Sequence, residues 1–310
     1  MTDSFHAGER AIQELTGERD KALLNGQAIA DTVPAGAIRF VAEQETAVVG
    51  NFESAGDLWA GLIAGPKGFA RVRDNRRQVE IAVDNTTAWS TPPPFIANLI
   101  QGSPLGVLFI ELATRRRLRV NGRITERDPH GLTLAVEQAY PNCPKYIQRR
   151  IIEQQEISLD ATGGVMEGTA LTDALHSWLG AADTFFVASA SPDGAVDVSH
   201  RGGSPGFVRL EHGALWIPDY PGNSMFNTFG NFYLNPRAGL CVPDFDGNRQ
   251  LQLTGDVSLE LSAGESAGET GGTGRWWRFV PRRWMIAPLN RPLAWKFIDA
   301  SPFNPPGPNA

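Results

Sequence analysis

The segment GPKGFARV, residues 65–72, returns later in the chain as GSPGFVRL, residues 203–210. Both copies share the pattern G-x-x-G-F-x-R, and the spacing between them also relates Gly56 to Gly194. A repeated glycine pattern predicts a repeated turn, because glycine adopts backbone conformations that other residues avoid. We therefore expect two copies of one structural unit.

Further segments match in the same order. LGVLF (105–109) corresponds to AGLCV (238–242), and LRVNGRI (118–124) corresponds to LQLTGDV (251–257), both at a slightly shorter spacing. A general likeness between β-barrels would explain the spacing of strands but not the shared glycine pattern. Two copies in one chain are expected to pack as a homodimer does, forming a pseudo-dimer with a ligand pocket between them.

Short apolar runs separated by Gly, Pro, Asn and Asp begin at Thr46. Many short strands with turn residues between them are typical of a barrel or sandwich. The expected strands are 47–52, 59–64, 70–72, 79–83, 106–112, 118–123 and 132–138, and the β pattern resumes at Phe185. The chain is therefore predicted to be mainly β, with helices at its edges.

Helical patterns lie outside these strands. Residues 1–33 read as mostly helical up to Pro34, a short helix is expected over 34–44, and another over 144–157. Gly163 and Gly164 read as a linker. The expected division is a helical segment at 1–45, a first barrel at 46–160 and a second barrel at 161–310.

Composition excludes several classes of protein. With 42% hydrophobic and 20% charged residues in 310, the chain is neither disordered nor collagen-like. It shows no apolar run long enough for a transmembrane helix and no secretory signal, and two cysteines make no disulfide framework, so a cytoplasmic location is expected. A net charge of −6 argues against nucleic-acid binding, and no membrane association is expected.

Polar and glycine residues are dense in the second copy, at DVSHRGG (197–203) and IPDYPGNSMFNTFGN (217–231). Arg201 offers a bidentate cation, and the adjacent glycines let backbone N–H groups approach an anion. Asn223, Ser224 and Thr228 add neutral donors, and 224–231 could open a helix whose N-terminus favours phosphate. The alternative, an arginine on a barrel rim beside turn glycines, remains open on the residues alone.

These two runs resemble the pyridoxamine 5'-phosphate oxidase-like FMN-binding split-barrel family, in particular its predicted flavin-nucleotide-binding subgroup. The resemblance covers about residues 185–260, and in the first copy it rests on LRVNGR and on YPNCPKYIQRR (140–150). Tyr220, Ser224 and the Asn-Pro-Arg at 235–237 are similar to the family's phosphate-binding stretch. There the family has Ser-Arg-Lys, whereas this chain has Asn-Ser-Met at 223–225, which shifts the expected phosphate contact partly onto Arg201.

The two copies have diverged in complementary ways. Opposite the 219–228 stretch, the first copy has only DNTTAWSTPPP (84–94), and WAGLIA (59–64) replaces the stretch with Arg201. The second copy in turn has WMIAPLN (284–290) where the first has YPNCPKY. One copy keeps the phosphate side and the other keeps Lys145 and Tyr146, which predicts one FMN per chain in a composite pocket.

The resemblance implies an FMN-dependent oxidoreductase made of two tandem split barrels. It implies Arg201 for the phosphate, with Ser199, Asn223 and Ser224 as donors, His200, Asp219 and Tyr220 along the ribityl chain or ring, and Lys145 and Tyr146 from the other copy. Gly202 allows close backbone approach. The expected cofactor-binding residues are thus Lys145, Tyr146, Ser199, His200, Arg201, Gly202, Asp219, Tyr220, Asn223 and Ser224; catalytic residues are not identified.

Several alternatives remain open. The same fold could hold deazaflavin or haem, or the protein could be a non-enzymatic flavin-binding or electron-transfer module. Oxidation of pyridoxamine phosphate itself is less favoured, because no second basic cluster beside Arg201 is evident. The expected partner is a small-molecule substrate or a redox protein, with further homodimerisation left open.

Other residues have a structural interpretation first. Alternation places Arg117, Arg119, Asn121 and Arg123 on one strand face, which usually is a solvated face, although Arg117 or Arg119 could approach an anion. Cys143 has no Cys or His at metal-ligand spacing, so no metal site is expected. The four tryptophans Trp276, Trp277, Trp284 and Trp295 are expected in the core or between barrels, and residues 261–274 in a loop.

Overall fold

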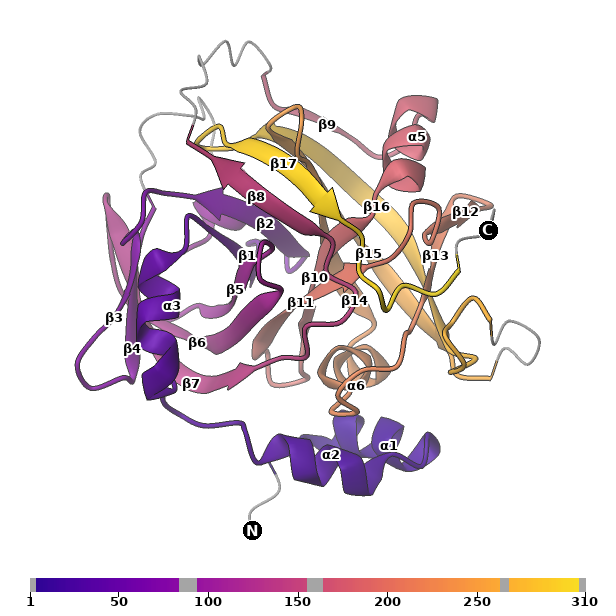
Figure 1. Ribbon diagram of the computed structural model, residues 1–310, viewed down its shortest axis with the longest axis horizontal. Coiled ribbons are helices and arrows are strands. Elements are labelled where there is room, and N and C mark those ends of the chain that lie inside the picture. Colours follow the sequence, from indigo (N-terminus) through magenta and orange to yellow (C-terminus); the bar gives the residue numbers. More distant parts are fainter. Residues whose placement is uncertain (1–3, 84–93, 155–163, 263–267, 307–310) are drawn as a thin grey trace.

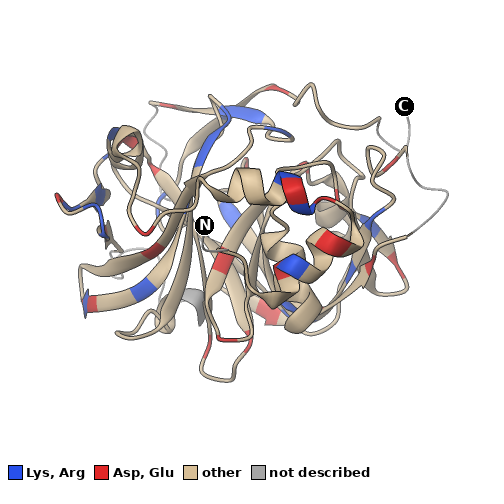
Figure 2. Cartoon of the chain, turned by 90° about the horizontal axis from the view of Figure 1, so that it is seen from below, with Lys and Arg blue, Asp and Glu red and all other residues tan. Residues whose placement is uncertain are grey.

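The computed structural model describes residues 4–83, 94–154, 164–262 and 268–306. Two large sheets dominate it, and they lie side by side with the helices at their edges (Figure 1). No helix among these residues is long and apolar enough to cross a bilayer. Acidic and basic residues are interspersed along the chain in the view from below (Figure 2).

The first sheet has seven strands in the order β2-β1-β5-β6-β7-β4-β3. Its neighbouring strands are antiparallel. The strands are β1 (Thr46–Phe52), β2 (Leu58–Ala64), β3 (Ala70–Val72), β4 (Gln78–Ala82), β5 (Pro104–Glu111), β6 (Arg116–Asp128) and β7 (Gly131–Pro141), with the short helix α4 (Pro94–Ala97) before β5. All seven expected strands of this unit are confirmed, with shifted ends.

The second sheet repeats this order as β11-β10-β14-β15-β16-β13-β12. Its members are β10 (Thr184–Ala190), β11 (Val196–Gly202), β12 (Arg209–Glu211), β13 (Ala214–Pro218), β14 (Arg237–Asp244), β15 (Arg249–Glu260) and β16 (Trp276–Pro288), joined at one edge by β9 (Met166–Gly168). Helix α6 (Asn227–Leu234) precedes β14 as α4 precedes β5. The expected fold class, mainly β with two tandem split barrels, is confirmed.

Equivalent glycines have equivalent geometry in the two units. Gly68 and Gly206 have φ of +86° and +87°, and Gly56 and Gly194 have +85° and +86°. Only glycine adopts this region without strain, so the repeated pattern records a repeated turn. The β-bulge also recurs, after Asn121 in the first unit and after Thr254 in the second.

The units pack against each other reciprocally. A Cβ on Gly106 of β5 would lie 2.9 Å from the Val196 carbonyl oxygen of β11, and one on the equivalent Gly239 of β14 would lie 2.6 Å from that of Leu58 in β2. Each unit thus lays its second strand across a glycine of the other. A buried apolar cluster with members from both units fills the interface, and each barrel also has its own core.

Two segments were predicted wrongly or not at all. The expected helix at 144–157 is instead strand β8 (Arg149–Glu153), which pairs with β17 (Ala294–Asp299); residues 155–157 lie outside the described part. Ile151 and Ile152 favour a strand once a partner strand is available. Helix α5 (Asp173–Ala181), capped by the Thr172 side chain, was not predicted.

The N-terminal helices are α1 (Ala7–Leu15), α2 (Arg19–Gly26) and α3 (Ile38–Glu43), the last preceded by the 3₁₀ turn Ala35–Ala37. Helix α1 crosses α6 where Gly8 faces Gly230, so closely that a Cβ on Gly8 would lie 2.1 Å from the Gly230 oxygen. Figure 1 shows α1 and α2 below α6. The N-terminal hairpin α1–α2 therefore belongs spatially to the second unit.

Candidate functional site

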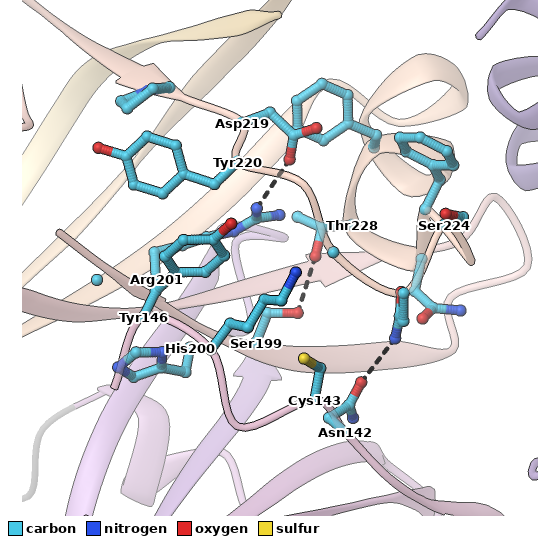
Figure 3. Close-up of a pocket in the computed structure, with 18 of the residues that line it drawn as sticks. Asn142, Cys143, Tyr146, Ser199, His200, Arg201, Asp219, Tyr220, Ser224 and Thr228 are labelled. Carbon is cyan, nitrogen blue, oxygen red and sulfur yellow. Dashed lines mark hydrogen bonds and ion pairs between the residues drawn. The ribbon is translucent and has the colours of Figure 1, made fainter. Parts of the chain in front are cut away.

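A cleft with an enclosed volume of about 120 Å³ lies between the units, at the end of β11 (Figure 3). The second unit supplies β11, the loop at 218–226 and the first turn of α6, and the first unit supplies the start of β6 and the loop after β7. Glu18 of the N-terminal hairpin completes the wall. The cleft is therefore composite, as the divergence of the two copies predicts.

All ten residues expected from the sequence line this one cleft. Lys145 and Tyr146 come from the first unit, and the other eight come from the second. Figure 3 shows Tyr146 and Cys143 facing Arg201, Asp219 and Tyr220 across it. The structure thus brings the set together, while the cofactor-binding role of each member remains a proposal.

Asp219 joins two arginines in the wall of the cleft. Its Oδ1 lies 3.0 Å from Arg201 Nη1, and its Oδ2 lies 2.9 Å from Arg275 Nε. The Nε of Arg201 is buried and has no partner among the described residues. One guanidinium donor of Arg201 is therefore left for an acceptor that this part of the chain does not supply.

Arg117 and His200 are further unsatisfied groups. Arg117 Nε and His200 Nε2 are buried without a partner in the described chain. Burial and the nearby Arg119 lower the pKa of Arg117 to about 9. Burial, together with Arg117 and Arg201, holds the pKa of His200 well below its ordinary value, so this imidazole is neutral at pH 7.

Arg119 is buried at the interface between the units. It forms an ion pair with Asp197, with Nε 2.8 Å from Oδ1, and it donates to Ser199 Oγ at 2.5 Å and to the Tyr140 hydroxyl at 2.8 Å. Although burial opposes the charge, Asp197 and Tyr140 keep the pKa of Arg119 above its ordinary value. Arg119 thus connects the first unit to strand β11.

The expectation of a solvated face is therefore wrong for two of the four residues on that face. Arg119 and Asn121 are only 6% exposed, and Arg117 is half-buried, whereas Arg123 is exposed. Alternation along β6 was predicted correctly, but the face that it generates meets β11 of the second unit. The packing of one unit on the other decides which of these arginines reach solvent.

Two tyrosines stand at the rim. The rings of Tyr146 and Tyr220 lie 4.9 Å apart at 41°, and the Tyr146 hydroxyl donates to the Pro221 carbonyl at 3.0 Å. Burial raises the pKa of Tyr146 to about 12, so the phenol stays protonated at pH 7. Ser301 Oγ accepts the Tyr146 N–H at 3.1 Å, which ties the C-terminal segment to the cleft.

The loop before α6 has an unusual backbone. Ser224 and Phe226 have φ of +63° and +58°, values that non-glycine residues rarely adopt. Asn223 donates to Asn142 Oδ1 of the first unit at 2.9 Å, and Thr228 lies 2.9 Å from Ser199, oxygen to oxygen. The expected helix at 224–231 begins later, at Asn227, because these residues form the turn that leads into it.

Sequence reasoning missed Glu18 and Arg275 in this cleft. It also found no second basic cluster near Arg201, and the structure corrects this, since Arg117, Lys145 and Arg275 line the same cleft. Arg275 follows the glycine-rich stretch, of which residues 263–267 lie outside the described part, and no local pattern distinguishes it. Glu18 lies on the N-terminal helical hairpin, and sequence periodicity does not predict where that hairpin packs on the barrels.

The pseudo-equivalent place in the first unit is closed by side chains. Leu62 and Ala64 stand in β2 where His200 and Gly202 stand in β11. Gln250 accepts the Leu62 N–H at 2.7 Å and donates to its carbonyl at 3.0 Å, and Asn290 bonds Ala64 in the same two ways. Residues 84–93, the expected counterpart of the 219–228 stretch, lie outside the described part.

The register of the sheets corrects one alignment. Leu118 pairs with Pro141 in the first unit and its counterpart Leu251 pairs with Ile286 in the second. The counterpart of Tyr140 is therefore Met285, one residue later than the sequence comparison placed it.

Three of the four tryptophans are buried as expected, Trp276, Trp277 and Trp284, and Trp295 is half-buried.

A larger cavity, of about 700 Å³, lies elsewhere, between α5, the β14–β15 turn and β17. Its arginines are matched by carboxylates: Arg150 lies 2.7 Å from Asp183, and Arg249 lies 2.8 Å from Asp244. The composite cleft differs, because Arg117 and Lys145 have no ion pair among the described residues.

Comparison with known proteins finds one match to a family model, in the second unit. Residues 171–276 match the family model described as Pyridoxamine 5'-phosphate oxidase, and this segment contains eight of the ten expected residues. No curated protein sequence matches the chain.

Solved structures that are similar to part of the chain have low sequence identity to it. A putative pyridoxamine 5'-phosphate oxidase from Lactobacillus delbrueckii is 12% identical, with a TM-score of 0.31, over 37% of this chain and 93% of that one. HupZ from Group A Streptococcus is 15% identical, with a TM-score of 0.27, over 42% and 98%. HutZ from Vibrio cholerae, described as a heme storage protein, is 11% identical, with a TM-score of 0.29, over 38% and 95%.

Proposed function

On the premise that residues 171–276 belong to the pyridoxamine 5'-phosphate oxidase family, we propose that the composite cleft binds one FMN per chain and that the protein is an FMN-dependent oxidoreductase. The observation that carries the proposal is the gathering of ten residues from both units around one cleft. When bound, FMN supplies one- and two-electron transfer, and the protein supplies anchorage, orientation and control of access.

The charge of the cleft suits a phosphate group. Its lining contains five cations, Arg117, Arg119, Lys145, Arg201 and Arg275, against the two carboxylates Glu18 and Asp219. The unpartnered Nε atoms of Arg117 and Arg201 are donors that an anion would satisfy. A buried donor without a partner costs free energy, so binding an acceptor there is favourable.

Each part of the cofactor has candidate contacts. Arg201 would hold the phosphate, and Ser199, Asn223 and Ser224 would donate to it. The rest of the cofactor would contact His200, Asp219, Tyr220, Lys145 and Tyr146. Gly202 is packed so tightly that an added Cβ would lie 2.2 Å from the backbone carbonyl oxygen of Tyr146. The cleft volume of about 120 Å³ is below the roughly 300 Å³ of small-molecule sites, so the cleft would enclose only part of an FMN molecule.

Identification of the released cofactor tests this proposal. Purified protein is denatured mildly, and the supernatant is analysed by absorbance and mass. FMN at one equivalent per chain is expected. A different cofactor, or none after incubation with FMN, would contradict it.

An Arg201→Ala variant tests the phosphate anchor. Loss of a charge-assisted phosphate contact is expected to weaken FMN binding by about 2–4 kcal/mol. Arg282→Ala is the matched control, because Arg282 is 42% exposed and pairs with Asp256 away from the cleft. Equal FMN affinity in the two variants would move the phosphate elsewhere.

Haem is a second candidate, favoured by one observation. His200 would supply a neutral imidazole whose buried Nε2 has no partner among the described residues, and a histidine nitrogen is a common ligand of haem iron. A Soret band in the purified protein that His200→Ala abolishes would support haem over FMN. Deazaflavin would be distinguished by its own absorbance spectrum.

Turnover separates an enzyme from a binding module. An oxidoreductase is expected to have a flavin that NAD(P)H or another donor reduces and that an acceptor reoxidises. Bound flavin that no donor reduces would favour the alternative of a non-enzymatic flavin-binding module.

A further inference from the structure

Glu18 brings a carboxylate into the cleft from outside both barrels. It lies between α1 and α2, and its side chain is 26% exposed. Its Oε2 accepts a hydrogen bond from Ser224 Oγ, and its Oε1 lies 3.1 Å from Arg275 Nη1. A hydroxyl and a guanidinium that converge on two carboxylate oxygens are the donors that also bind phosphate.

These contacts engage donors that a ligand would otherwise use. Ser224 is one of the residues expected to donate to a phosphate, and in the structure its hydroxyl donates to Glu18. Arg275 is only 8% exposed and is shared between Glu18 and Asp219. An oxyanion that binds Ser224 and Arg275 must therefore take the place of the Glu18 carboxylate.

The backbone on either side of Ser224 is held independently of Glu18. Gln13 Nε2 donates to the Met225 carbonyl at 2.9 Å, and Asn25 Nδ2 donates to the Asn223 carbonyl at 2.7 Å. The N-terminal hairpin thus stays docked on this loop through two other side chains. Displacement of Glu18 requires a change of its side-chain rotamer and no release of the hairpin.

A second partner for the displaced carboxylate is within reach. Lys21 lies one turn further along α2, with its Nζ 3.8 Å from Glu18 Oε2, and it is 57% exposed. Rotation toward Lys21 would exchange a half-buried contact for a solvated one. It would also add the space of the carboxylate to the enclosed volume of the cleft.

We propose that Ser224 and Arg275 form an oxyanion subsite, that Glu18 is its internal occupant, and that a phosphate or carboxylate group of the ligand displaces Glu18 toward Lys21. The inference rests on the proposed function only in taking the cleft as the ligand site. A purely structural ion pair makes the opposite prediction, because its loss would loosen the loop and weaken anion binding.

The direction in which one substitution changes the affinity for phosphate decides between these roles. Glu18→Gln removes the competing charge while keeping the size of the side chain, and it is expected to tighten binding of orthophosphate by about three- to tenfold, measured by titration calorimetry. Glu14→Gln is the matched control: Glu14 is exposed on the same hairpin and lines no part of the cleft. Orthophosphate affinity that is unchanged or weaker in Glu18→Gln overturns the proposal.

A second substitution tests where the subsite lies. Ser224→Ala removes one donor and is expected to weaken orthophosphate binding at least about threefold; unchanged affinity would place the anion elsewhere and overturn the subsite. Thermal unfolding of each variant checks that the fold is retained. If Ser224→Ala does not fold, Ser224→Gly, which also lacks the hydroxyl and accepts the positive φ of this residue, replaces it.

Flavin binding separates this inference from the proposed function. If FMN binds, Glu18→Gln is expected to tighten FMN and to leave riboflavin, which lacks the phosphate, unchanged. Tighter orthophosphate binding without any flavin binding would sustain the subsite and reject the FMN proposal. FMN binding that Glu18→Gln does not strengthen would reject the subsite alone.

Discussion

Arg119 of the first unit and Asp197 of the second form an ion pair across the interface, with Nε 2.8 Å from Oδ1 and both side chains 7% exposed. The same guanidinium reaches Ser199, which lines the cleft. Removal of one member leaves the other charge buried and unpaired, which is costly.

Arg119→Met is therefore expected to lower the free energy of unfolding by about 3–5 kcal/mol. Urea denaturation measures this loss. Arg123→Met, on the same strand face but 46% exposed, is expected to have a small effect. A double variant with Asp197→Leu should recover part of the loss, and no recovery would contradict the pairing.

Glu9 gives the stability a defined pH dependence. Burial raises its pKa from 4.5 to about 7, against the hydrogen bonds from Asn227 and His6. The folded chain thus keeps this proton to higher pH than the unfolded chain does. The stability from this group is complete below pH 4.5 and is lost as the pH rises to about 7.

Glu9→Gln is expected to raise the free energy of unfolding at pH 8 by about 1–2 kcal/mol, and to have little effect near pH 4.5. Urea denaturation at both pH values, with Glu14→Gln as control, measures the difference. An equal effect at both pH values would show that titration of Glu9 is not responsible.

Close packing of the units at Gly239 makes a steric prediction. An added Cβ would lie 2.6 Å from the Leu58 oxygen and 2.6 Å from the Trp59 Cα, both backbone atoms that cannot yield easily. Gly239→Ala is expected to destabilise the fold by about 2–3 kcal/mol. Gly180→Ala, in helix α5 with open space around it, should instead be neutral or stabilising in thermal unfolding.

If the cleft binds FMN as proposed, the closed first-unit position predicts one flavin per chain. Because Gln250 and Asn290 bond the backbone of Leu62 and Ala64, a second ligand would have to break these contacts. Titration with FMN is expected to saturate at one equivalent. Saturation at two equivalents would contradict the asymmetry.

The Gln250 contact can be tested directly. Gln250→Ala is expected to lower stability by about 1–3 kcal/mol, because the Leu62 backbone groups are buried and would lose both partners. Its FMN stoichiometry should stay at one. A rise to two equivalents would show that Gln250 alone closes the first-unit position.

Local patterns were enough for the strands of the first sheet and for the repeat. The glycines at 68 and 206 require positive φ, and alternation along β6 separates Arg119 from Leu118. The ten cleft residues were grouped by the resemblance and by the divergence of the copies. The placement of Arg119 in a buried interface depends on a strand of the other unit, which no local pattern contains.

Two other features depended on distant partners. Residues 149–153 form a strand because β17 pairs with them from a distant part of the chain, whereas the sequence analysis predicted a helix there. Glu18 reaches the cleft because Gly8 and Gly230 let α1 and α6 touch. Both contacts join segments that are far apart in the chain, and neither segment has a sequence pattern that predicts its partner.

Strand β8 closes the first half of the chain, yet in the described structure its partner is β17, near the C-terminus. Until residues 294–299 have been synthesised, β8 therefore lacks the partner strand that it has in the described structure. Chains truncated before Ala294 are therefore expected to aggregate through this unprotected edge.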